Sequence, residues 1–373
     1  MLFIIFYTFL FFILHFYLGR GESFRRSKLV AQYILCFALL FGFFGFRDLP
    51  ILNDTAHYYE HFMEVIYDDY FERLPFYYLE RFDRFEPGYQ IYERIVGRIW
   101  YDPYAIILIT SLIISIAFVW LAGQYTDKIA LWLFIMILSG IGTMYSAQRQ
   151  AIAAIIFFVS FRYLYPKHVL WYYCSIPLAM TFHNSAIILF LIPTICKLEL
   201  NKRNISLLVV ATVLTAFGIL NIILFLDYGE SFYYKQALQR ETTPLAAMLN
   251  CALSLLLLLV IYRLHRKNPI IDDEERPLWW LSLLCVCILF ISVPFLILSR
   301  YALFFQPFIH ILFIRKIYQC KNILNRRGIL FAIIAILFLR FIVVLVYKPE
   351  WSHFYPYAFY DFNELYHETR LGY

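Results

Sequence analysis

Long apolar runs recur along almost the whole chain and are separated by short polar stretches. Such runs predict helices, and a helix needs roughly 20 residues to cross a membrane fully. The stretches 129–164 and 169–196 are candidates for tilted or broken helices, because Pro177 and Pro193 interrupt backbone hydrogen bonding. The pattern predicts about 12 transmembrane helices, at residues 1–18, 29–46, 104–123, 129–146, 150–164, 169–182, 185–196, 205–226, 245–262, 278–299, 301–314 and 329–347.

Three longer segments depart from this alternation, namely 47–103, 227–244 and 348–373. A loop of more than about 15 residues in a compact protein usually has a function or a structure of its own. Within the first segment, one helical face is apolar and predicts an amphipathic helix at the membrane interface, begun by Glu86-Pro87. The apolar face contains Tyr89, Tyr92, Ile95, Val96, Ile99 and Trp100, and the opposite face Glu93, Arg94 and Arg98.

Composition agrees with this pattern and fixes the class of protein. The 373 residues are 62% hydrophobic and 16% charged, which lies outside the soluble globular range. We therefore predict an all-α, polytopic membrane helical bundle, a single transmembrane domain over 1–373, with lipid rather than nucleic acid around it. Met1 opens directly into an apolar run, which favours a retained first helix over a cleaved signal peptide.

Lys and Arg gather in alternate loops, and basic short loops face the cytoplasm. We therefore predict that both chain ends and the extracytoplasmic segment 47–103 lie on the outer face. The seven Cys fall in predicted helices or on the cytoplasmic side, so they do not indicate a disulfide framework. The basic loops contain Arg20 to Lys28, Lys128, Arg162 and Lys167, Lys197 to Arg203, Arg263 to Arg276, and Arg315 to Arg327.

Three arginines are predicted at the outer ends of apolar helices, namely Arg47, Arg149 and Arg300. Each one taken alone is explained by a helix-end anchor or an ion pair, because an unpaired guanidinium in hydrocarbon costs several kcal/mol. Their coincidence on one face predicts a cationic pocket, since guanidinium groups match the oxygens of a diphosphate. Gln148 and Gln150 flank Arg149 and could bind sugar hydroxyls.

The outer carboxylates nearest to these arginines in the sequence are Asp48, Asp54 and Glu86. Each could take a proton from a sugar hydroxyl or could only pair with an arginine, and Asp54 could also cap the helix that follows it. His183 lies at an outer turn between two apolar runs. It is either a polar helix cap or a further candidate base.

Two other patterns of ionisable residues are less specific. Arg340 lies inside the last apolar run, roughly 10 Å from its outer end at 1.5 Å per residue, and is either functional or reaches outward to the interface. His57-Tyr-Tyr-Glu60-His61 has the spacing of a metal motif, but no third ligand is identifiable. Because a phosphate-binding glycine loop and a dinucleotide fingerprint are also missing from the sequence, we predict neither a metal nor a cofactor.

Several short motifs, taken in order along the chain, together resemble the EpsG family of exopolysaccharide and capsule polymerases, which is similar to the Wzy O-antigen polymerases. The most distinctive are, in this order, Arg-Asp followed by Asp-Thr, then Glu-Pro-Gly-Tyr, then Arg-Gln-Ala, while the motifs with His183 and Arg300 are weaker. They are Arg47-Asp48, Asn53-Asp54-Thr55 with Tyr58, Glu86-Pro87-Gly88-Tyr89, Gln148-Arg149-Gln150-Ala151, Phe182-His183-Asn184-Ser185, Arg300-Tyr301 and Tyr355-Pro356-Tyr357.

The resemblance implies a metal-independent membrane glycosyltransferase. Its substrate would be undecaprenyl-diphosphate-linked oligosaccharide repeat units, joined on the outer (periplasmic) face of the bacterial cytoplasmic membrane, and a chain-length regulator is an expected partner. Asp54, Glu86, His183 and Arg149 would be catalytic. The diphosphate or glycan would contact Arg47, Asp48, Tyr89, Gln148, Gln150, Arg300, Tyr301 and Arg340.

Three other functions are alternatives to a polymerase. A transporter (flippase) for the lipid-linked oligosaccharide usually has charges near mid-membrane and related halves, whereas these charges favour one face and the sequence shows no repeat. An O-antigen ligase would need nearly the same pocket but would use a different acceptor lipid. An outer-face acyltransferase would need a nucleophile or an acyl-binding signature, which the sequence does not show.

Overall fold

The computed structural model describes residues 1–18, 25–67, 85–164, 168–225, 245–267, 275–293, 296–347, 349 and 353–362. These residues form helices joined by turns, together with one isolated β-bridge between Arg47 and Phe359. The predicted all-α fold class is confirmed. The predicted outer segment 227–244 and the loop bases Arg20 and Lys167 lie outside the described residues.

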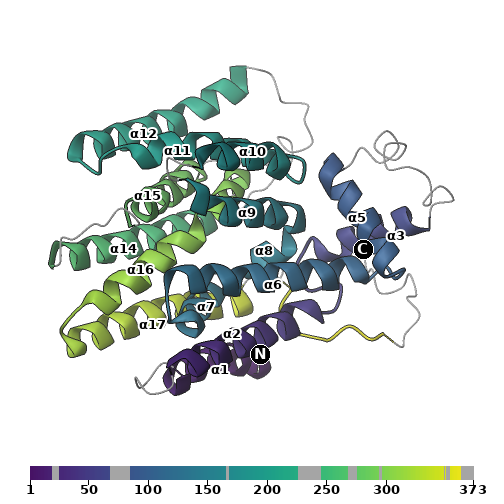
Figure 1. Ribbon diagram of the computed structural model, residues 1–373. Helices are drawn as coiled ribbons and strands as arrows, with labels where there is room; N and C mark the ends of the chain where they lie inside the picture. The colour runs from purple at the N-terminus through teal and green to yellow at the C-terminus, as the bar shows by residue number, and fades with distance from the viewer. Residues whose placement is uncertain are drawn as a thin grey trace. The chain divides into compact units, whose positions relative to one another are not determined.

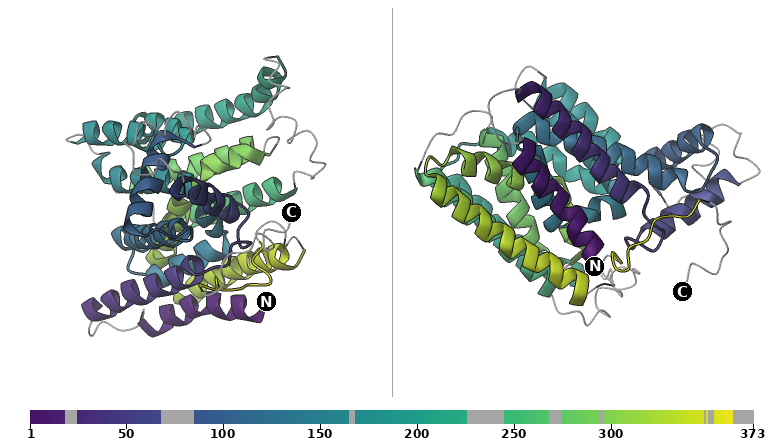
Figure 2. Two further views of the ribbon diagram at one scale, coloured as in Figure 1. Left: turned by 90° about the vertical axis from the view of Figure 1, so that its right-hand side faces the viewer. Right: turned by 90° about the horizontal axis from the view of Figure 1, so that it is seen from below.

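The chain divides into two compact units, which are described separately (Figures 1 and 2). Unit 1 comprises Met1–Leu189 and Phe331–Tyr373, and unit 2 comprises Phe190–Leu330. The single transmembrane domain over 1–373 therefore stays a prediction. The helices of unit 1 are α1 (Leu2–Leu18), α2 (Arg25–Gly45), α3 (Thr55–Ile66), α5 (Pro87–Ile99), α6 (Ala105–Tyr125), α7 (Ile129–Leu138), α8 (Gly142–Ser146), α9 (Gln148–Ser160), η1 (Phe161–Tyr163), α10 (Val169–Met180), most of η2 (Asn184–Leu191) and, from Phe331 onward, α17 (Ile323–Tyr347).

Helix α6 is the centre of unit 1, because it contacts α2, α3, α5, α7, α8 and α9. Its buried small polar residues each bind a different neighbour. Thr110 Oγ1 lies 2.8 Å from the Tyr92 hydroxyl of α5, and Ser115 Oγ lies 2.9 Å from the Tyr145 hydroxyl of α8. Small side chains allow close helix packing, and their hydroxyls satisfy polar groups that would otherwise be buried without a partner.

Arg47, which directly follows the turn after α2, is fully buried. Its five N–H groups bind protein oxygens: the Thr55 hydroxyl accepts two at 3.2 Å, Ser111 Oγ one at 2.9 Å, and the Phe44 and Tyr145 carbonyls one each. A guanidinium has five donors, so this arrangement uses all of them. Arg47 thus joins α2, α3, α6 and α8, and its side chain has no surface left for a substrate.

Unit 2 is organised around α15, which contacts α11, α12, α14, η4 and α16. Glu275 and Lys316 form a buried ion pair at 2.5 Å, and Gln319 donates to the same carboxylate at 3.0 Å. Burying both charges is tolerable because each has a partner. The helices of unit 2 are α11 (Ile192–Lys197), α12 (Lys202–Phe225), α14 (Leu245–Lys267), α15 (Glu275–Ile291), η4 (Leu296–Phe304), α16 (Gln306–Gln319) and the first residues of α17.

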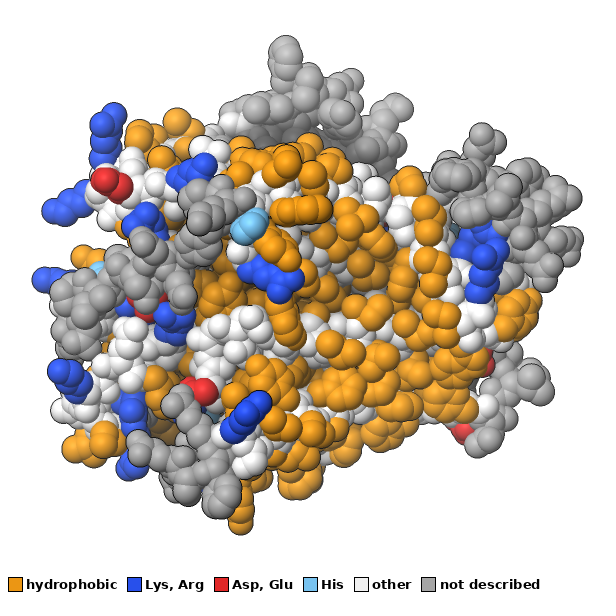
Figure 3. All heavy atoms as spheres, viewed as in Figure 1, with side chains coloured by type: hydrophobic (Ala, Val, Ile, Leu, Met, Phe, Trp, Pro, Cys, Tyr) orange, Lys and Arg blue, Asp and Glu red, His pale blue; other side chains and the backbone are white. Residues whose placement is uncertain are grey.

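Four of the described helices are long and apolar enough to cross a membrane, at Arg26–Gly45, Ala105–Tyr125, Ala247–Arg266 and Ile323–Tyr347. Four shorter apolar helices cover Leu2–Leu18, Ile129–Leu138, Val169–Met180 and Asn184–Lys197. Hydrophobic side chains also cover most of the described surface on the face drawn in Figure 3. The structure therefore supports a membrane helical protein, while the number of about 12 crossings stays a prediction.

The two stretches predicted to be tilted or broken helices are both interrupted. The first contains no proline, and the second is interrupted after Pro177 rather than at it. The first ends at Leu138 and turns at Gly140, whose φ of +98° suits a residue without Cβ. The second runs through Pro177 and ends at Met180, and Pro193 lies in the first turn of α11, where its missing N–H costs nothing.

The amphipathic helix predicted after Glu86 is present as α5, but its polar face was assigned wrongly. Glu93 and Arg94 are buried, whereas Ile95 and Ile99 are 53% and 70% exposed. The hydrophobic pattern could not reveal this arrangement, because the inward position of Glu93 depends on His61, a partner 32 residues away. The exposed side of α5 therefore presents Ile91, Ile95 and Ile99 beside Arg98.

We predict that Arg47→Ala destabilises the protein by about 3–5 kcal/mol, because it leaves a buried polar network without its central partner. Arg47→Lys should not restore stability, since an ammonium group has three donors and no planar fork. The measurement is the thermal unfolding midpoint in detergent, with the exposed Arg98→Ala as control. Equal midpoints for Arg47→Ala and Arg98→Ala would contradict the structural role.

Candidate functional site

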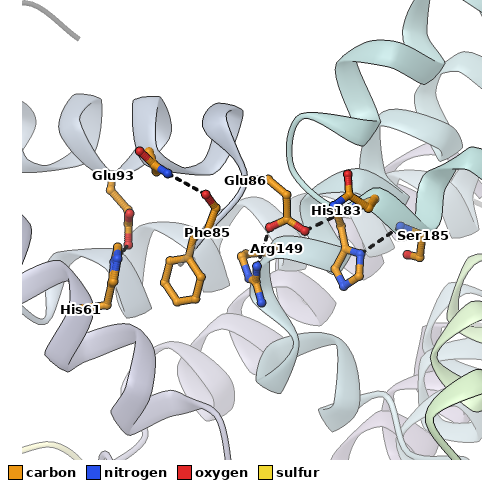
Figure 4. Close-up of polar contacts among 9 residues, drawn as sticks. His61, Phe85, Glu86, Glu93, Arg149, His183 and Ser185 are labelled. Atoms are coloured by element: carbon orange, nitrogen blue, oxygen red, sulfur yellow. Dashed lines mark hydrogen bonds and ion pairs between the residues drawn. The ribbon is translucent and has the colours of Figure 1, made fainter. Parts of the chain in front are cut away.

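Three motifs that are far apart in the sequence meet in unit 1 (Figure 4). They are the start of α5 at Glu86-Pro87-Gly88-Tyr89, the start of α9 at Gln148-Arg149-Gln150, and the turn at Phe182–Ser185 between α10 and η2. Direct hydrogen bonds join each motif to the other two. The structure thus gathers in one place three of the motifs that the sequence analysis singled out.

Gly88 allows the start of α5 to approach the turn after α10 closely. Its amide donates to the Thr181 carbonyl at 2.8 Å. A Cβ atom at residue 88 would lie 2.2 Å from Thr181 Oγ1 and 2.8 Å from the Thr181 carbonyl oxygen. Because real Cβ contacts are never that short, only glycine fits here without a shift of the backbone.

Arg149 and Glu86 form the ion pair at the centre of this site, with side chains 22% and 13% exposed. Arg149 Nη1 donates to Glu86 Oε2, and the Asn184 amide donates to Glu86 Oε1 at 3.4 Å. Glu86 precedes α5 but makes no side-chain cap bond to that helix. Its carboxylate therefore binds α9 and the turn before η2 rather than the start of its own helix, which matches the expected pairing with an arginine.

The guanidinium of Arg149 is also held from other sides. It lies 4.3 Å from the ring centroid of Phe85, in cation–π geometry, and it shares a hydrogen bond with the Tyr58 hydroxyl. Burial acts to lower the pKa of Arg149, but Tyr58 and Glu86 outweigh burial and the pKa is raised. Arg149 Nε is buried and has no hydrogen-bond partner among the residues that the structure describes.

The two glutamines and Tyr89 connect the site to the protein interior. The Tyr89 hydroxyl donates to Gln148 Oε1 at 3.2 Å, and Gln150 Nε2 donates to Ser185 Oγ at 3.4 Å. Gln148, Gln150 and Tyr89 are all buried. In this structure they fix the three motifs to one another, whereas the sequence analysis expected them to face a glycan.

His183 lies beside the ion pair, in the turn that ends α10. The Ser185 amide donates to His183 Nδ1 at 3.1 Å, so Nδ1 acts as an acceptor. A neutral imidazole that accepts at Nδ1 has its proton on Nε2. This geometry matches the helix-cap alternative, and it leaves the use of His183 as a base untested.

Asp54 and Asp48 lie on the α3 side of the site. The Asp54 amide donates to Ser146 Oγ at 3.4 Å, and its carboxylate makes no cap bond to α3. Asp54 acts on Tyr58, whose pKa is raised first by burial and also by this carboxylate. Asp48 Oδ1 accepts from the Leu49 amide at 2.9 Å in a local turn. Of the two, Asp54 is thus the one linked through Tyr58 to Arg149.

Two other predicted arginines of unit 1, Arg47 and Arg340, bind elsewhere in that unit. Arg340 Nη1 donates to the Leu138 carbonyl at 3.2 Å, where α7 ends beside Gly140, so Arg340 caps the broken helix. Arg300 and Tyr301 lie in η4 of unit 2, and their position relative to Arg149 stays a prediction. Arg47 is enclosed as described above.

Phe85, His61 and Glu93 are site residues that the sequence analysis missed. Phe85 directly precedes Glu86, a position where an apolar residue often packs against the first turn of a helix, and this could have signalled its role. His61 was considered only as part of a metal motif. His57 instead points to Glu60, at 3.7 Å, and His61 to Glu93, at 2.9 Å. Among the described residues, no group of three or more His, Cys, Asp or Glu gathers.

Comparison with known proteins adds one match. The model of a protein family described as the EpsG family matches residues 30–359. No curated protein and no solved structure gives a significant match. The matched range contains the three motifs that meet in unit 1, together with Arg47 and Arg300.

We predict that Gly88→Ala destabilises the site by about 1–3 kcal/mol, the usual cost of forcing extra atoms into a packed region. The thermal unfolding midpoint in detergent measures the change. Gly218→Ala in α12 is the matched control, because a Cβ there would meet nothing within 4 Å. A Gly88→Ala protein as stable as the Gly218→Ala protein would refute the close approach.

Proposed function

We propose that this chain, which belongs to the EpsG family, is the glycosyltransferase that joins undecaprenyl-diphosphate-linked oligosaccharide repeat units. Family membership implies a membrane protein of exopolysaccharide biosynthesis. The finer proposal is a polymerase that builds O-antigen, capsule or exopolysaccharide. About 12 apolar segments would cross the bacterial cytoplasmic membrane, and the site would face the periplasm or the exterior.

The observation that carries this proposal is the pairing of Arg149 with Glu86 in a partly exposed position. A cation grips an anionic substrate group, and a carboxylate next to it accepts a proton. Arg149 also lies in the first turn of α9, where the helix dipole adds positive potential. The site therefore favours an anion such as a diphosphate.

The proposed reaction needs charge stabilisation and one proton transfer. An acceptor sugar hydroxyl forms the new bond to the anomeric carbon of the donor, while the bond from that carbon to the diphosphate oxygen breaks. The electron pair leaves with the lipid diphosphate, where Arg149 stabilises the growing charge. The hydroxyl proton passes to a base of the protein.

Glu86 is the base that the geometry favours among Glu86, Asp54 and His183. Its carboxylate is bound to Arg149 and to the Asn184 amide in the absence of substrate. A diphosphate at Arg149 would compete for that guanidinium and release one carboxylate oxygen toward the acceptor. The Asp54 carboxylate acts electrostatically on Tyr58, which contacts Arg149, and His183 already accepts a hydrogen bond at Nδ1.

Other residues complete the proposal in supporting roles. Arg300, Tyr301 and Asp48 would contact the glycan or the diphosphate. Arg47, Arg340, Tyr89, Gln148 and Gln150 would hold the site in shape, as their contacts suggest. The reaction as proposed uses no metal or cofactor, and a chain-length regulator is the proposed protein partner.

We predict that Arg149→Ala lowers the polymerisation rate about 100-fold, the usual effect of losing one charge-stabilising donor. Arg149→Lys should recover only part of the rate, because an ammonium group cannot make a bidentate contact. The assay supplies purified protein with a lipid-linked repeat unit and a chelator and follows a ladder of products. Arg98→Ala, an exposed arginine on α5, is the control.

The same assay separates the alternatives. A ladder from the wild-type protein establishes polymerisation, capping of a foreign lipid points to a ligase, and movement of substrate across the bilayer without new bonds points to a transporter. Full-length ladders from both Arg149 variants would overturn the assignment of Arg149.

We further predict that Glu86→Gln lowers kcat at least about 100-fold, because an amide cannot take the acceptor proton. Substrate binding should persist or tighten, since Arg149 loses its competing carboxylate. Asp54→Asn and His183→Asn are the matched comparisons. If one of these two, rather than Glu86→Gln, produces the largest loss in kcat, that residue is the base and the present assignment fails.

A further inference from the structure

A buried acid and imidazole lie behind Arg149, on the side away from Glu86 (Figure 4). His61 Nδ1 of α3 lies 2.9 Å from Glu93 Oε1 of α5, and both side chains are almost completely buried. Burial raises the pKa of the Glu93 carboxyl, while its hydrogen bond to His61 and the charge of Arg149 act in the opposite direction. Placing these groups in the interior is unfavourable, so their presence calls for a role beyond packing.

Phe85 lies between the His61–Glu93 pair and the Arg149–Glu86 ion pair. The imidazole of His61 and the ring of Phe85 have centroids 4.1 Å apart, and the Arg149 guanidinium lies 4.3 Å from the same Phe85 centroid. Figure 4 shows the Phe85 ring between the His61 imidazole and the Arg149 guanidinium. The Phe85 carbonyl accepts from Gln90 Nε2 at 2.6 Å, which fixes the backbone that carries the ring. The order across the site is thus Glu93, His61, Phe85, Arg149 and Glu86.

His57, the other histidine of the His57–His61 motif, has a different environment from His61. His57 lies one helical turn earlier, with its side chain 46% exposed, and pairs with Glu60 on the surface. His61 has the opposite environment and is the one that contacts the ring under Arg149. His57 therefore provides an internal reference for any effect specific to His61.

We propose that His61, Phe85 and Glu93 form a positioning unit that sets the direction of the Arg149 guanidinium and couples its charge to the buried pair. The aromatic face holds the cation on one side, and the imidazole packs on the ring from the other. Because Glu93 is hydrogen-bonded to the His61 imidazole, the imidazole cannot turn away from Phe85 without breaking a buried hydrogen bond. These three residues are positioning residues, since they act on substrate only through Arg149.

The coupling has a definite sign. Removing the positive charge of Arg149 makes it easier for the buried pair to hold a proton, so its titration moves to higher pH. The Arg149 charge and the pair are separated by the two ring contacts. At that separation, with an effective dielectric constant of about 20, loss of the charge moves the titration midpoint of the pair by about one pH unit. The proton belongs to the pair and not to one residue. The charged and titratable groups around the pair are Arg149, Tyr89, Tyr92 and the adjacent buried Arg94.

Nuclear magnetic resonance of the full chain in nanodiscs tests the coupling without any substrate. The protein contains nitrogen-labelled histidine, and His61 is assigned from the signal lost in His61→Asn. In Arg149→Ala we expect the titration of the His61–Glu93 pair, followed through the His61 signals, to move to higher pH by about one unit, or the Nδ1 signal to shift if the pair stays in one state, with the His57 signals unchanged. If the His61 signals are unaffected, or move no more than in Arg98→Ala, the coupling is absent.

A kinetic test addresses positioning and rests on the proposed polymerase function. Phe85→Leu keeps an apolar side chain but removes the ring, so kcat per folded protein should fall about 10- to 100-fold with little change in KM. Phe85→Tyr should restore the rate because it keeps the ring, and Glu93→Gln should resemble Phe85→Leu. His57→Ala is the control with unchanged rate. An unchanged kcat in Phe85→Leu and Glu93→Gln would overturn the positioning role.

The two tests distinguish failure of the polymerase proposal from failure of the positioning unit. If the wild-type protein makes no ladder, the polymerase proposal fails, while the resonance measurement still decides whether Arg149 is coupled to His61. If a ladder forms but neither the His61 signals nor kcat respond, the polymerase proposal stands and the positioning unit does not.

Discussion

The ion pair between Arg149 and Glu86 is the interaction on which the rest of the site depends. A guanidinium in the first turn of a helix is repelled by the helix dipole, and partial burial adds a desolvation cost. Arg149 is stable there because Glu86, Tyr58 and the ring of Phe85 surround it. Glu86 can reach it only because Gly88 lets α5 begin against the turn at Thr181. An anionic substrate could replace Glu86 without leaving the guanidinium unpaired.

The two arginines of unit 1 that the sequence analysis grouped together differ in a way that only packing can reveal. Arg47 gives all five donors to protein oxygens, so its charge is used in joining helices around α6. Arg149 is partly exposed and has a buried donor atom without a described partner. The first is thus a structural residue of the bundle, and the second is the one that can meet a ligand. Both follow from burial and hydrogen bonding rather than from position at a helix end.

The sequence predicted the helices well, because apolar runs of helical length are a strong local signal. The helices at Leu2–Leu18, Ala105–Tyr125 and Val169–Met180 lie within three residues of the ranges expected from the apolar pattern. Motif order also pointed to Glu86, Arg149 and His183, which the structure brings together. Which face of α5 turns inward was not predictable, since it depends on His61. Likewise, the contact of Glu86 with Asn184 joins residues 98 positions apart, and no local pattern encodes it.

We propose that Arg149 binds the diphosphate of the lipid carrier. Native mass spectrometry of the protein in nanodiscs with undecaprenyl diphosphate measures this binding directly, with the wild-type, Arg149→Ala and Arg98→Ala proteins compared at equal ionic strength. We expect Arg149→Ala alone to weaken binding at least about 10-fold, since a charged hydrogen bond contributes roughly 1.5–3 kcal/mol. Equal affinity of all three proteins for undecaprenyl diphosphate would contradict it.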